Sequence, residues 1–379
     1  MPPPVNILHL HSSFSLGGKE ARAVRLMNLF GDRARHTIVS GVPDQISAQD
    51  AIADGIQYEI AQNPPPLTGR PSVGRYETIA RYMRRFDLVL TYNWGAIDGV
   101  MARRAFPKGA PPVIHHEDGF NADEADGLKI ERNIYRRIAL PAAHALVVPS
   151  KTLETIALQA WKQPPARLRR IVNGIATSWY DAKPDPKAIP GFRRRSGEVV
   201  IGAVAGLRAV KDLPALVRAA GGVSARVRLV IVGEGPEREH ILDAAEAMGM
   251  EDRVHLPGFL PDPHRYLGLF DILALSSKSE QFPISVVEGM AAGLAIAAPQ
   301  VGDILEMVSD ENRPFIAVKA NEVALRDSLQ ALAGCTPAQR AYVGAKNRAR
   351  AIAEYDESVM IDQYVTLYEA AMSRPGSLR

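Results

Sequence analysis

The chain has 379 residues, of which 46% are hydrophobic and 23% are charged, and its formal net charge is +3. A chain of this length is too long for one ordinary core and suits two α/β domains. No apolar run approaches the roughly 18 residues that a membrane helix needs, which argues against a membrane-spanning protein. The single cysteine, Cys335, excludes an internal disulfide and a cysteine metal cluster, so we expect a cytoplasmic protein.

Short apolar runs that are rich in β-branched residues alternate with longer amphipathic stretches along the chain. Runs this apolar are typical of strands buried on both faces, and their alternation with helices predicts parallel sheets. The predicted strands of the first half are 5–10, 36–41, 56–61, 87–92, 111–116, 145–150 and 168–175. Those of the second half are 199–207, 227–233, 254–259, 271–277, 294–299 and 314–318.

A proline-rich and basic stretch, 181–197, separates the two sets of strands and is the one convincing linker. We therefore expect two doubly wound α/β domains, the first over 1–180 and the second over 198–355. A final helix within 356–379 could cap either domain, and we expect it to pack back on the first. Ligands of such sheets bind at the carboxyl ends of the strands, so two facing sheets would offer a cleft between the domains.

The first predicted strand is followed by Gly17-Gly18-Lys19-Glu20, which leads into a predicted helix over 21–30. Paired glycines let a backbone approach a ligand closely, and a helix N-terminus favours an anion. Gly17 and Gly18 are therefore candidates to lie beneath a diphosphate, with a simple tight turn as the alternative. The glycine patterns of dinucleotide-binding and P-loop proteins are absent, which disfavours both of those classes.

Two stretches of the first domain, 75–86 and 129–140, are basic and amphipathic. Basic residues also outnumber acidic ones over 1–180, whereas the reverse holds for the remainder of the chain. Helices of this kind can lie on an anionic membrane surface, which would place the protein at the inner face of the membrane. Their apolar residues are equally those that a surface helix needs to pack on a sheet, so an ordinary surface helix is the alternative.

The predicted strand 111–116 ends in His115-His116-Glu117-Asp118. Two histidines and two acids at a strand end suggest a metal site, an acid/base site or, through paired carboxylates, glycoside hydrolysis. Adjacent side chains on a strand point to opposite faces, so His115 and His116 are not expected to share one metal ion. A buried structural histidine is the alternative for either of them.

Two cations, Arg208 and Lys211, follow the first strand of the second domain. They project near the carboxyl end of the sheet, where they could hold a diphosphate leaving group as negative charge develops on it. Ordinary surface cations are the alternative. Further along, Gly302 and Asp303 open another predicted helix after Pro299, and Asp303 suits the N-cap of that helix.

The most informative segment runs from Ser276 to Pro299. Here a predicted strand ends in a polar loop, and a helix starts near Pro283 because proline is tolerated in a first helical turn. Glu280 lies in the loop and Glu288 on the helix, with seven residues between them. A loop carboxylate can accept hydrogen bonds from sugar hydroxyls, and one on the helix can bind a ribose diol. The alternative is a glutamate that satisfies the helix dipole beside a solvated loop charge.

This segment resembles the signature of glycosyltransferase family 4, and the resemblance covers nearly the whole chain. It continues through the segments 17–20, 173–174, 206–211, 232–236 and 254–258. The resemblance implies a GT-B fold, with two Rossmann-like domains that face an interdomain cleft. It also implies sugar transfer from a nucleotide-sugar donor with retention of configuration and without a divalent metal.

The resemblance carries roles over to particular residues. In similar enzymes the two glutamates contact the transferred sugar and the ribose, which here gives Glu280 and Glu288. Lys211 matches a phosphate-binding lysine directly, whereas Gly206 stands where many members have an arginine, so Arg208 is the candidate to replace that guanidinium. The implied catalytic residues are His115, Glu280 and Lys211, and the implied donor-binding residues are Gly17, Gly18, Arg208, Lys211, Glu280, Phe282, Glu288 and Gly302.

Two of these assignments leave alternatives open. Similar enzymes place one histidine of the strand end against the donor sugar, and we favour His115 over His116. They also place backbone N–H groups near Gly302 against the donor phosphates, usually with a second glycine where this chain has Asp303.

The sequence therefore predicts a metal-independent retaining hexosyltransferase with a UDP- or GDP-linked donor and no other cofactor. Its acceptor is expected to be a saccharide or a lipid-linked saccharide of cell-surface polysaccharide or glycolipid biosynthesis, and no nucleic acid is expected as a partner. One alternative is a nucleotide-sugar epimerase with the same fold, which would convert the donor alone. Another is a non-catalytic nucleotide-sugar-binding subunit, because a fold does not guarantee activity.

Overall fold

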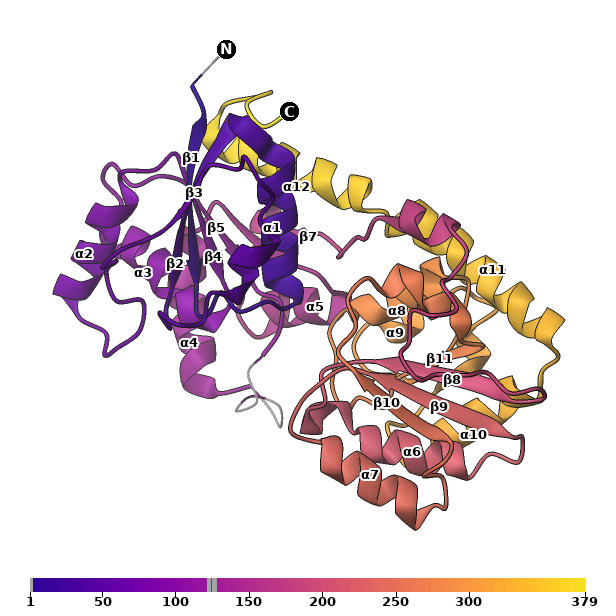
Figure 1. Cartoon of the computed structure of the whole chain (residues 1–379). Coiled ribbons are helices and arrows are strands. Elements are labelled where there is room, and N and C mark those ends of the chain that lie inside the picture. Colours follow the sequence, from indigo (N-terminus) through magenta and orange to yellow (C-terminus); the bar gives the residue numbers. More distant parts are fainter. Residues whose placement is uncertain (1–2, 121–123, 125–127) are drawn as a thin grey trace. The chain divides into compact units, whose positions relative to one another are not determined.

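The computed structural model describes residues 3–120, 124 and 128–379. Within this part the chain divides into two compact units (Figure 1). The first comprises the residues up to Val172 together with Met360–Arg379, and the second comprises Asn173–Val359. Each unit is an α/β domain built on one sheet whose neighbouring strands run parallel. The predicted fold class of two doubly wound domains is confirmed.

The sheet of the first unit has the strand order β3-β2-β1-β4-β5-β6-β7. The chain passes from β1 outward to β2 and β3 and then returns to the other side of β1 with β4. The order therefore reverses between β1 and β4, and such a reversal is where ligands of open α/β sheets bind. The strands are β1 (Val5–His11), β2 (Ala34–Ser40), β3 (Tyr58–Ile60), β4 (Leu88–Tyr92), β5 (Val113–His116), β6 (Ala145–Val148) and β7 (Leu168–Arg170).

Helices cover both faces of this first sheet. One face packs against α2 (Val73–Met83), α3 (Asp98–Ala105), the end of α4 (Ile130–Ala139) and α5 (Lys151–Gln159). The other face packs against α1 (Gly18–Phe30) and α12 (Glu357–Met372). Strands covered on both faces must be apolar throughout, which explains why they could be recognised as continuous apolar runs.

The C-terminal helix α12 completes the first unit. Its apolar side chains recur at helical spacing, and Met360, Tyr364, Leu367 and Tyr368 are buried. Tyr368 meets the ring of Phe30 from α1 edge-on, with ring centroids 6.3 Å apart. Figure 1 shows α12 lying beside α1. The helix therefore closes a face of the first sheet that would otherwise expose apolar residues.

The sheet of the second unit has the order β10-β9-β8-β11-β12-β13, so its order reverses between β8 and β11. The strands are β8 (Val199–Val204), β9 (Val227–Val232), β10 (Val254–Gly258), β11 (Ile272–Ala274), β12 (Ala295–Pro299) and β13 (Ile316–Ala317). The helices are α6 (Leu213–Gly221), α7 (Arg238–Ala247), α8 (Ile284–Ala291), α9 (Ile304–Met307), α10 (Glu322–Gly334) and α11 (Pro337–Glu354).

The compact units do not divide at the boundaries expected from the sequence. The division lies after Val172 rather than near residue 180, because the segment that follows pairs with the chain between α11 and α12. Ile175 forms a bridge with Asp356, whose carboxylate also binds Thr177. The expected linker 181–197 lies along the second unit, where the carbonyl oxygen of Pro190 is 2.8 Å from Nε2 of His255.

Candidate functional site

The loops at the carboxyl end of the second sheet are packed tightly against one another. Gly233 and Gly235 follow β9 with φ of +147° and +153°, conformations that favour glycine. A Cβ at either position would collide with the backbone carbonyl of Ala205 or Leu207, which follow β8. Close backbone packing of this kind fixes the loops that flank the reversal in strand order.

Lys211 and Glu280 meet across this reversal. Lys211 ends a short 3₁₀ turn after β8, and Glu280 lies in the loop after β11. The Nζ of Lys211 donates to Oε1 of Glu280 at 2.5 Å, and Ser277 Oγ donates to the same oxygen at 2.6 Å. Ser276 Oγ donates to the carbonyl oxygen of Lys211 at 2.7 Å. The two loops therefore hold a cation and a carboxylate at the place where open α/β sheets bind ligands.

Arg208 supplies a second cation beside this pair. Its side chain is exposed and has no hydrogen-bonding or ionic partner among residues 3–120, 124 and 128–379. A Cβ placed on Gly206 would lie 3.4 Å from Nε of Arg208, so the guanidinium fills the space above that glycine. The position therefore suits the suggestion that Arg208 replaces an arginine at position 206.

Glu288 lies on α8, away from the Lys211–Glu280 pair, and is flanked by two tyrosines. Burial raises the pKa of Glu288 to about 7. Burial and then the charge of Glu288 raise the pKa of both Tyr180 and Tyr266. The hydroxyl of Tyr266 is buried and has no hydrogen-bond partner within the described part of the chain. Sequence reasoning missed both tyrosines, because neither stands in a recognisable pattern.

Gly302 joins the loop after β12 to the loop that carries Glu280. Its φ is +57°, and a Cβ there would lie 2.5 Å from the carbonyl oxygen of Glu280 and 2.6 Å from that of Gln281. The backbone N–H of Asp303 donates to Gln281 at 3.0 Å. Asp303 is the N-cap residue of the four-residue helix α9, as expected, although its side chain makes no capping hydrogen bond there. Gly302 thus positions Glu280 through the backbone.

Phe282 has a packing position. Its side chain is buried and meets Tyr355 edge-on, with ring centroids 5.5 Å apart. This contact anchors the start of α8 on the end of α11. The structure therefore gives Phe282 a role in fixing the Glu280 loop, whereas its expected contact with the donor stays a prediction.

In the first unit, Gly17 and Gly18 lie at the N-terminus of α1 as expected. The side chain of Glu20 folds back over them, so that a Cβ on Gly17 would lie 3.1 Å from Oε2 of Glu20. Lys19 forms an ion pair with the same glutamate. A carboxylate of the chain itself thus occupies the positive end of the helix, and a diphosphate at these glycines stays a prediction.

The two histidines at the end of β5 point to opposite faces of the sheet, as the alternation predicts. His115 binds Thr91 through Nδ1 at 2.7 Å, and its Nε2 lies 3.6 Å from a carboxylate oxygen of Glu117. His116 binds Tyr368 of α12 through Nε2 at 3.0 Å, and burial lowers its pKa to about 3. Both rings are fully buried, so each has structural partners, and a donor contact for His115 stays a prediction.

Two family models match this chain, one in each unit. The model for Glycosyltransferase Family 4 matches residues 16–179, and the model for Glycosyl transferases group 1 matches residues 185–350. Together they cover most of both units, including the loops that carry Lys211, Glu280 and Gly302. The chain belongs to the GT-B glycosyltransferases of this family.

This glycosyltransferase is similar to two bacterial proteins. It is 23% identical over 262 residues to N-acetyl-alpha-D-glucosaminyl L-malate synthase of Bacillus anthracis, a match that covers 69% of this chain and 64% of the relative. It is 25% identical over 354 residues to 2-deoxystreptamine N-acetyl-D-glucosaminyltransferase of Streptomyces fradiae, covering 82% of this chain and 80% of the relative.

Among solved structures, the glycosyltransferase is similar to Anabaena HepE, crystallised in complex with UDP and glucose. The two share 19% sequence identity with a TM-score of 0.79, over 97% of this chain and 100% of that one. At this identity the likeness establishes the shared fold.

A buried ion pair of the first unit was not singled out by sequence reasoning. Arg22 of α1 binds both carboxylate oxygens of Asp118, at 2.5 and 2.9 Å, and Asn93 accepts a hydrogen bond from the Asp118 N–H at 2.8 Å. Burial alone would raise the pKa of Asp118, but the charge of Arg22 lowers it below its usual value. Burial also lowers the pKa of neighbouring Lys19 to about 8. These groups surround the first unit's reversal in strand order, so the glycosyltransferase carries charged side chains at both reversals.

Residues 3–120, 124 and 128–379 of the glycosyltransferase contain neither a cluster suited to a metal ion nor a helix suited to span a membrane. No group of three or more His, Cys, Asp or Glu side chains in this part could hold a metal ion. No helix in the same part is long and apolar enough to cross a membrane.

Proposed function

We propose that this chain transfers a hexose from a nucleotide sugar to a saccharide or lipid-linked saccharide, with retention of anomeric configuration. The observation that carries the proposal is the meeting of Lys211 and Glu280 across the second reversal in strand order, with Arg208 beside them. The names of the two bacterial relatives, both of which contain an N-acetylglucosaminyl group, support the transfer of a sugar. UDP is the first nucleotide to test, because HepE was crystallised with it.

Each charged group of the second unit has a role in this proposal. Lys211 and Arg208 bind the diphosphate and stabilise the negative charge that develops on it. Glu280 accepts hydrogen bonds from hydroxyls of the transferred sugar, and Glu288 accepts them from the ribose. One guanidinium group and one ammonium group at the diphosphate can neutralise its charge in place of a divalent ion. EDTA is therefore expected to leave turnover intact.

The transfer follows from these contacts. The bond between the anomeric carbon and the diphosphate oxygen breaks, and the acceptor oxygen bonds to the same face of that carbon. The acceptor proton passes to an oxygen of the leaving phosphate. No carboxylate nucleophile is needed for retention, because the acceptor oxygen attacks the face from which the diphosphate leaves. Glu280, whose Oε1 accepts from Lys211 and Ser277, is not assigned that role.

Docking on an anionic membrane belongs to this proposal, but the structure changes which residues of α4 would provide it. Arg136 is fully buried, where it pairs with Glu117 and Glu124, and Arg132 pairs with Glu124. Two arginines of the basic stretch 129–140, Arg132 and Arg136, are therefore engaged within the first unit.

The apolar residues of α4 face outward instead. Ile130, Ile134 and Ile138 recur at every fourth position and are 73%, 49% and 45% exposed. Lys129 and Arg137 are exposed at the same helix. An apolar stripe flanked by cations suits shallow insertion into an anionic lipid surface, as a lipid-linked acceptor would require.

Vesicle co-sedimentation tests this docking. Binding to vesicles of phosphatidylglycerol should fall in the variant Ile134→Ser, while Val323→Ser, an exposed apolar residue of the second unit, should bind like the wild type. Equal binding by all three proteins, or none by the wild type at low salt, would leave a soluble acceptor as the proposal.

The transfer itself is tested by incubating the purified protein with labelled UDP-glucose, UDP-N-acetylglucosamine and GDP-mannose. Each donor is supplied with and without a lipid extract and a set of soluble saccharides. Label should pass from one donor to an acceptor, and the anomeric proton coupling of the product should match that of the donor. Conversion of a donor into a different nucleotide sugar without acceptor would identify an epimerase. Donor binding without release of nucleoside diphosphate would identify a non-catalytic subunit.

A further inference from the structure

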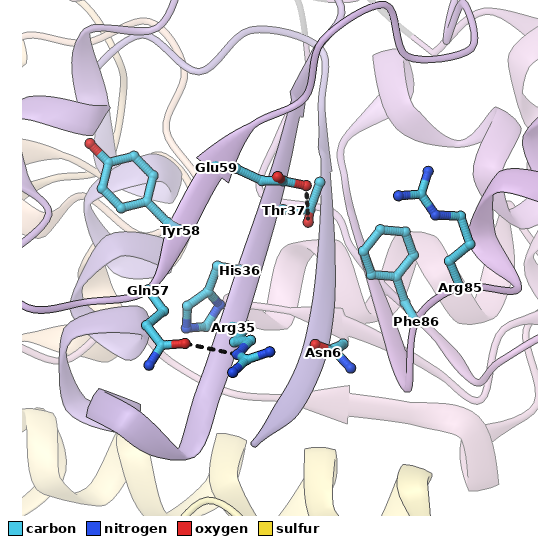
Figure 2. A pocket seen from close by; sticks show the side chains of 9 residues that line it. All are labelled: Asn6, Arg35, His36, Thr37, Gln57, Tyr58, Glu59, Arg85 and Phe86. Carbon is cyan, nitrogen blue, oxygen red and sulfur yellow. Dashed lines mark hydrogen bonds between the residues drawn. The ribbon is translucent and has the colours of Figure 1, made fainter. Parts of the chain in front are cut away.

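A polar pocket of about 360 Å³ lies at the opposite end of the first sheet from the site loops. It is lined by side chains from the amino ends of β1 and β2, from β3, and from the segment between α2 and β4 (Figure 2). Asn6 is the second residue of β1 and Arg35 the second of β2. Since β1 continues for five more residues, the carboxyl end lies roughly 16 Å away along the strand.

The floor of this pocket departs from the pattern of a parallel sheet. Asn6 is in register with Arg35, and Thr37 with Glu59, so all four side chains share one face of three neighbouring strands. The faces of parallel strands are normally covered by helices and carry apolar residues. Here Asn6, Arg35 and Glu59 are exposed. The helical layer that buries Leu8 and Leu10 on the same face of β1 does not cover this corner.

Donors and acceptors in the pocket are held in place but not saturated. Thr37 donates to one oxygen of Glu59 at 2.9 Å, and Arg35 donates through Nε to Gln57 at 2.8 Å, as the dashed lines of Figure 2 mark. The side-chain amide of Asn6 and the guanidinium of Arg85 have no hydrogen-bond partner within residues 3–120, 124 and 128–379. The second oxygen of Glu59 and the terminal nitrogens of Arg35 therefore remain for a ligand.

The side of the pocket formed by Arg85 and Phe86 is also ordered by contacts within the chain. The Arg85 guanidinium lies 4.9 Å from the ring centre of Tyr82 and 5.8 Å from that of Phe86. These cation–π contacts hold the guanidinium beside the half-buried ring of Phe86 without using its N–H groups. The pocket thus combines a flat apolar surface with planar groups that can form paired hydrogen bonds.

We propose that this pocket binds a segment of a saccharide chain. Carboxylate, carboxamide and guanidinium groups each present two polar atoms at a spacing that suits neighbouring hydroxyls, and an aromatic face suits the C–H side of a sugar ring. A phosphate or sulfate is disfavoured because the Glu59 carboxylate is one of the side chains that line the pocket. An apolar ligand would leave both guanidinium groups without partners.

Because the pocket lies far from the carboxyl ends of the strands, we assign it the binding of a part of the saccharide that is remote from the reacting end. This assignment rests on the proposed function, because a saccharide chain is the expected acceptor or product of the proposed transferase. A glycan bound at the amino end of the first sheet would stay attached to the enzyme while its growing end is exchanged elsewhere. Long acceptors would then have a lower KM than short ones of the same terminal structure.

Saturation-transfer NMR and calorimetry with cellohexaose, maltohexaose and chitohexaose test the proposal on the full chain. At least one hexasaccharide should bind, and its affinity should fall about tenfold in Arg85→Ala and in Glu59→Gln. The matched control Arg84→Ala removes the neighbouring exposed arginine, which does not line the pocket, and should bind like the wild type. Thermal unfolding of each variant verifies that it is folded.

The outcomes separate this proposal from the proposed function. If none of the three hexasaccharides binds, or if all variants bind equally well, the proposal that this pocket binds a saccharide would be wrong. UDP titrated into the same samples reports on the donor site independently. UDP binding without saccharide binding would overturn the pocket proposal and leave the transferase proposal standing. Saccharide binding without binding of UDP, or of GDP titrated in the same way, would do the reverse.

Discussion

Lys211 and Glu280 are 69 residues apart in the chain, yet Nζ of the first lies 2.5 Å from Oε1 of the second. Their side chains are largely buried, with 18% and 10% exposed. The proposed donor would engage the two groups separately, the lysine at the diphosphate and the glutamate at the sugar. Donor binding therefore has to exchange this internal pair for two contacts with the ligand.

Lys211→Ala should weaken nucleoside diphosphate binding by about 10- to 100-fold, because a charged hydrogen bond contributes about 1.5–3 kcal/mol. The variant also leaves Glu280 without its cation, so its charge repels the phosphates. Calorimetric titration with UDP and GDP measures the loss. Lys319→Ala, which removes an exposed lysine of the same unit, is the control and should bind normally. Equal affinities in both variants would remove Lys211 from the phosphate site.

Glu280→Gln should affect the sugar-bearing donor more than the free diphosphate. The amide keeps the shape of the side chain but accepts fewer hydrogen bonds from sugar hydroxyls. It also releases Lys211, which should leave free UDP binding unchanged or slightly tighter. Parallel titrations with UDP and UDP-glucose give the ratio directly. A loss of the same size for both ligands would place Glu280 away from the sugar.

Donor affinity should depend on pH through Glu288, because burial raises its pKa to about 7. Below that pH the carboxyl group is protonated and accepts ribose hydrogen bonds less well. Affinity should therefore fall as the pH drops from 8 to 6, by at most about tenfold per unit below the pKa. The phosphates of the ligand titrate in the same range, so the readout is the difference between wild type and Glu288→Gln. Identical pH profiles would rule out this role.

The first unit should lose stability in mild acid. Burial lowers the pKa of His9, His11, His36 and His116, so the native state keeps them neutral. As the pH falls below about 6.5, these histidines bind protons in the unfolded chain but stay neutral in the native state. The free energy of unfolding should then fall by about 1.4 kcal/mol per histidine for each pH unit, until the folded pKa is reached.

The variant His11→Phe isolates part of this effect. Both ring nitrogens of His11 are buried without a hydrogen-bond partner, and its ring stacks on Tyr92 with centroids 4.1 Å apart. Phenylalanine keeps the stacking and removes the buried polar atoms, so it should raise stability by about 1 kcal/mol at pH 7. The gain should be larger at pH 5. Thermal melts at both pH values measure it, and an unchanged difference between them would refute the assignment of the acid sensitivity.

Arg136→Ala should lower the free energy of unfolding by about 3–5 kcal/mol, because it leaves Glu117 buried without its arginine and Glu124 with Arg132 alone. Ile134→Ser on the exposed side of the same helix should change it by at most about 0.5 kcal/mol. Urea denaturation compares the two. A mild effect of Arg136→Ala would contradict the buried ion-pair arrangement.

The sheets could be predicted from the sequence because their strands are buried on both faces and stand out as apolar runs. The start of α8 near Pro283 could be predicted for a similar local reason, since proline suits the first turn of a helix. The position of 181–197 along the second unit could not, because its partners Arg265 and His255 come from distant segments.

The same limit applies to side-chain environments. The periodicity of α4 predicted an amphipathic helix but not which face would be buried. Trp161 and Phe120 stack on the guanidinium of Arg136. Both lie outside α4, so the sequence of the helix does not predict these contacts. Glu280 and Glu288 were singled out because both lie in the one segment, 276–299, that resembles a family signature. Tyr180 and Tyr266 lie near Glu288 but come from separate segments, so no local sequence pattern predicted them.

Thermal unfolding with added nucleotide tests the central claim, that the carboxyl end of the second sheet binds the nucleoside diphosphate of a sugar donor. The wild-type protein is melted with millimolar UDP, GDP and ADP, and Lys211→Ala is melted beside it. One nucleotide should stabilise the wild type, by about 2.7 kcal/mol when its concentration is about 100 times its Kd. The shift should shrink in Lys211→Ala. An unchanged melting temperature with all three nucleotides would contradict the account.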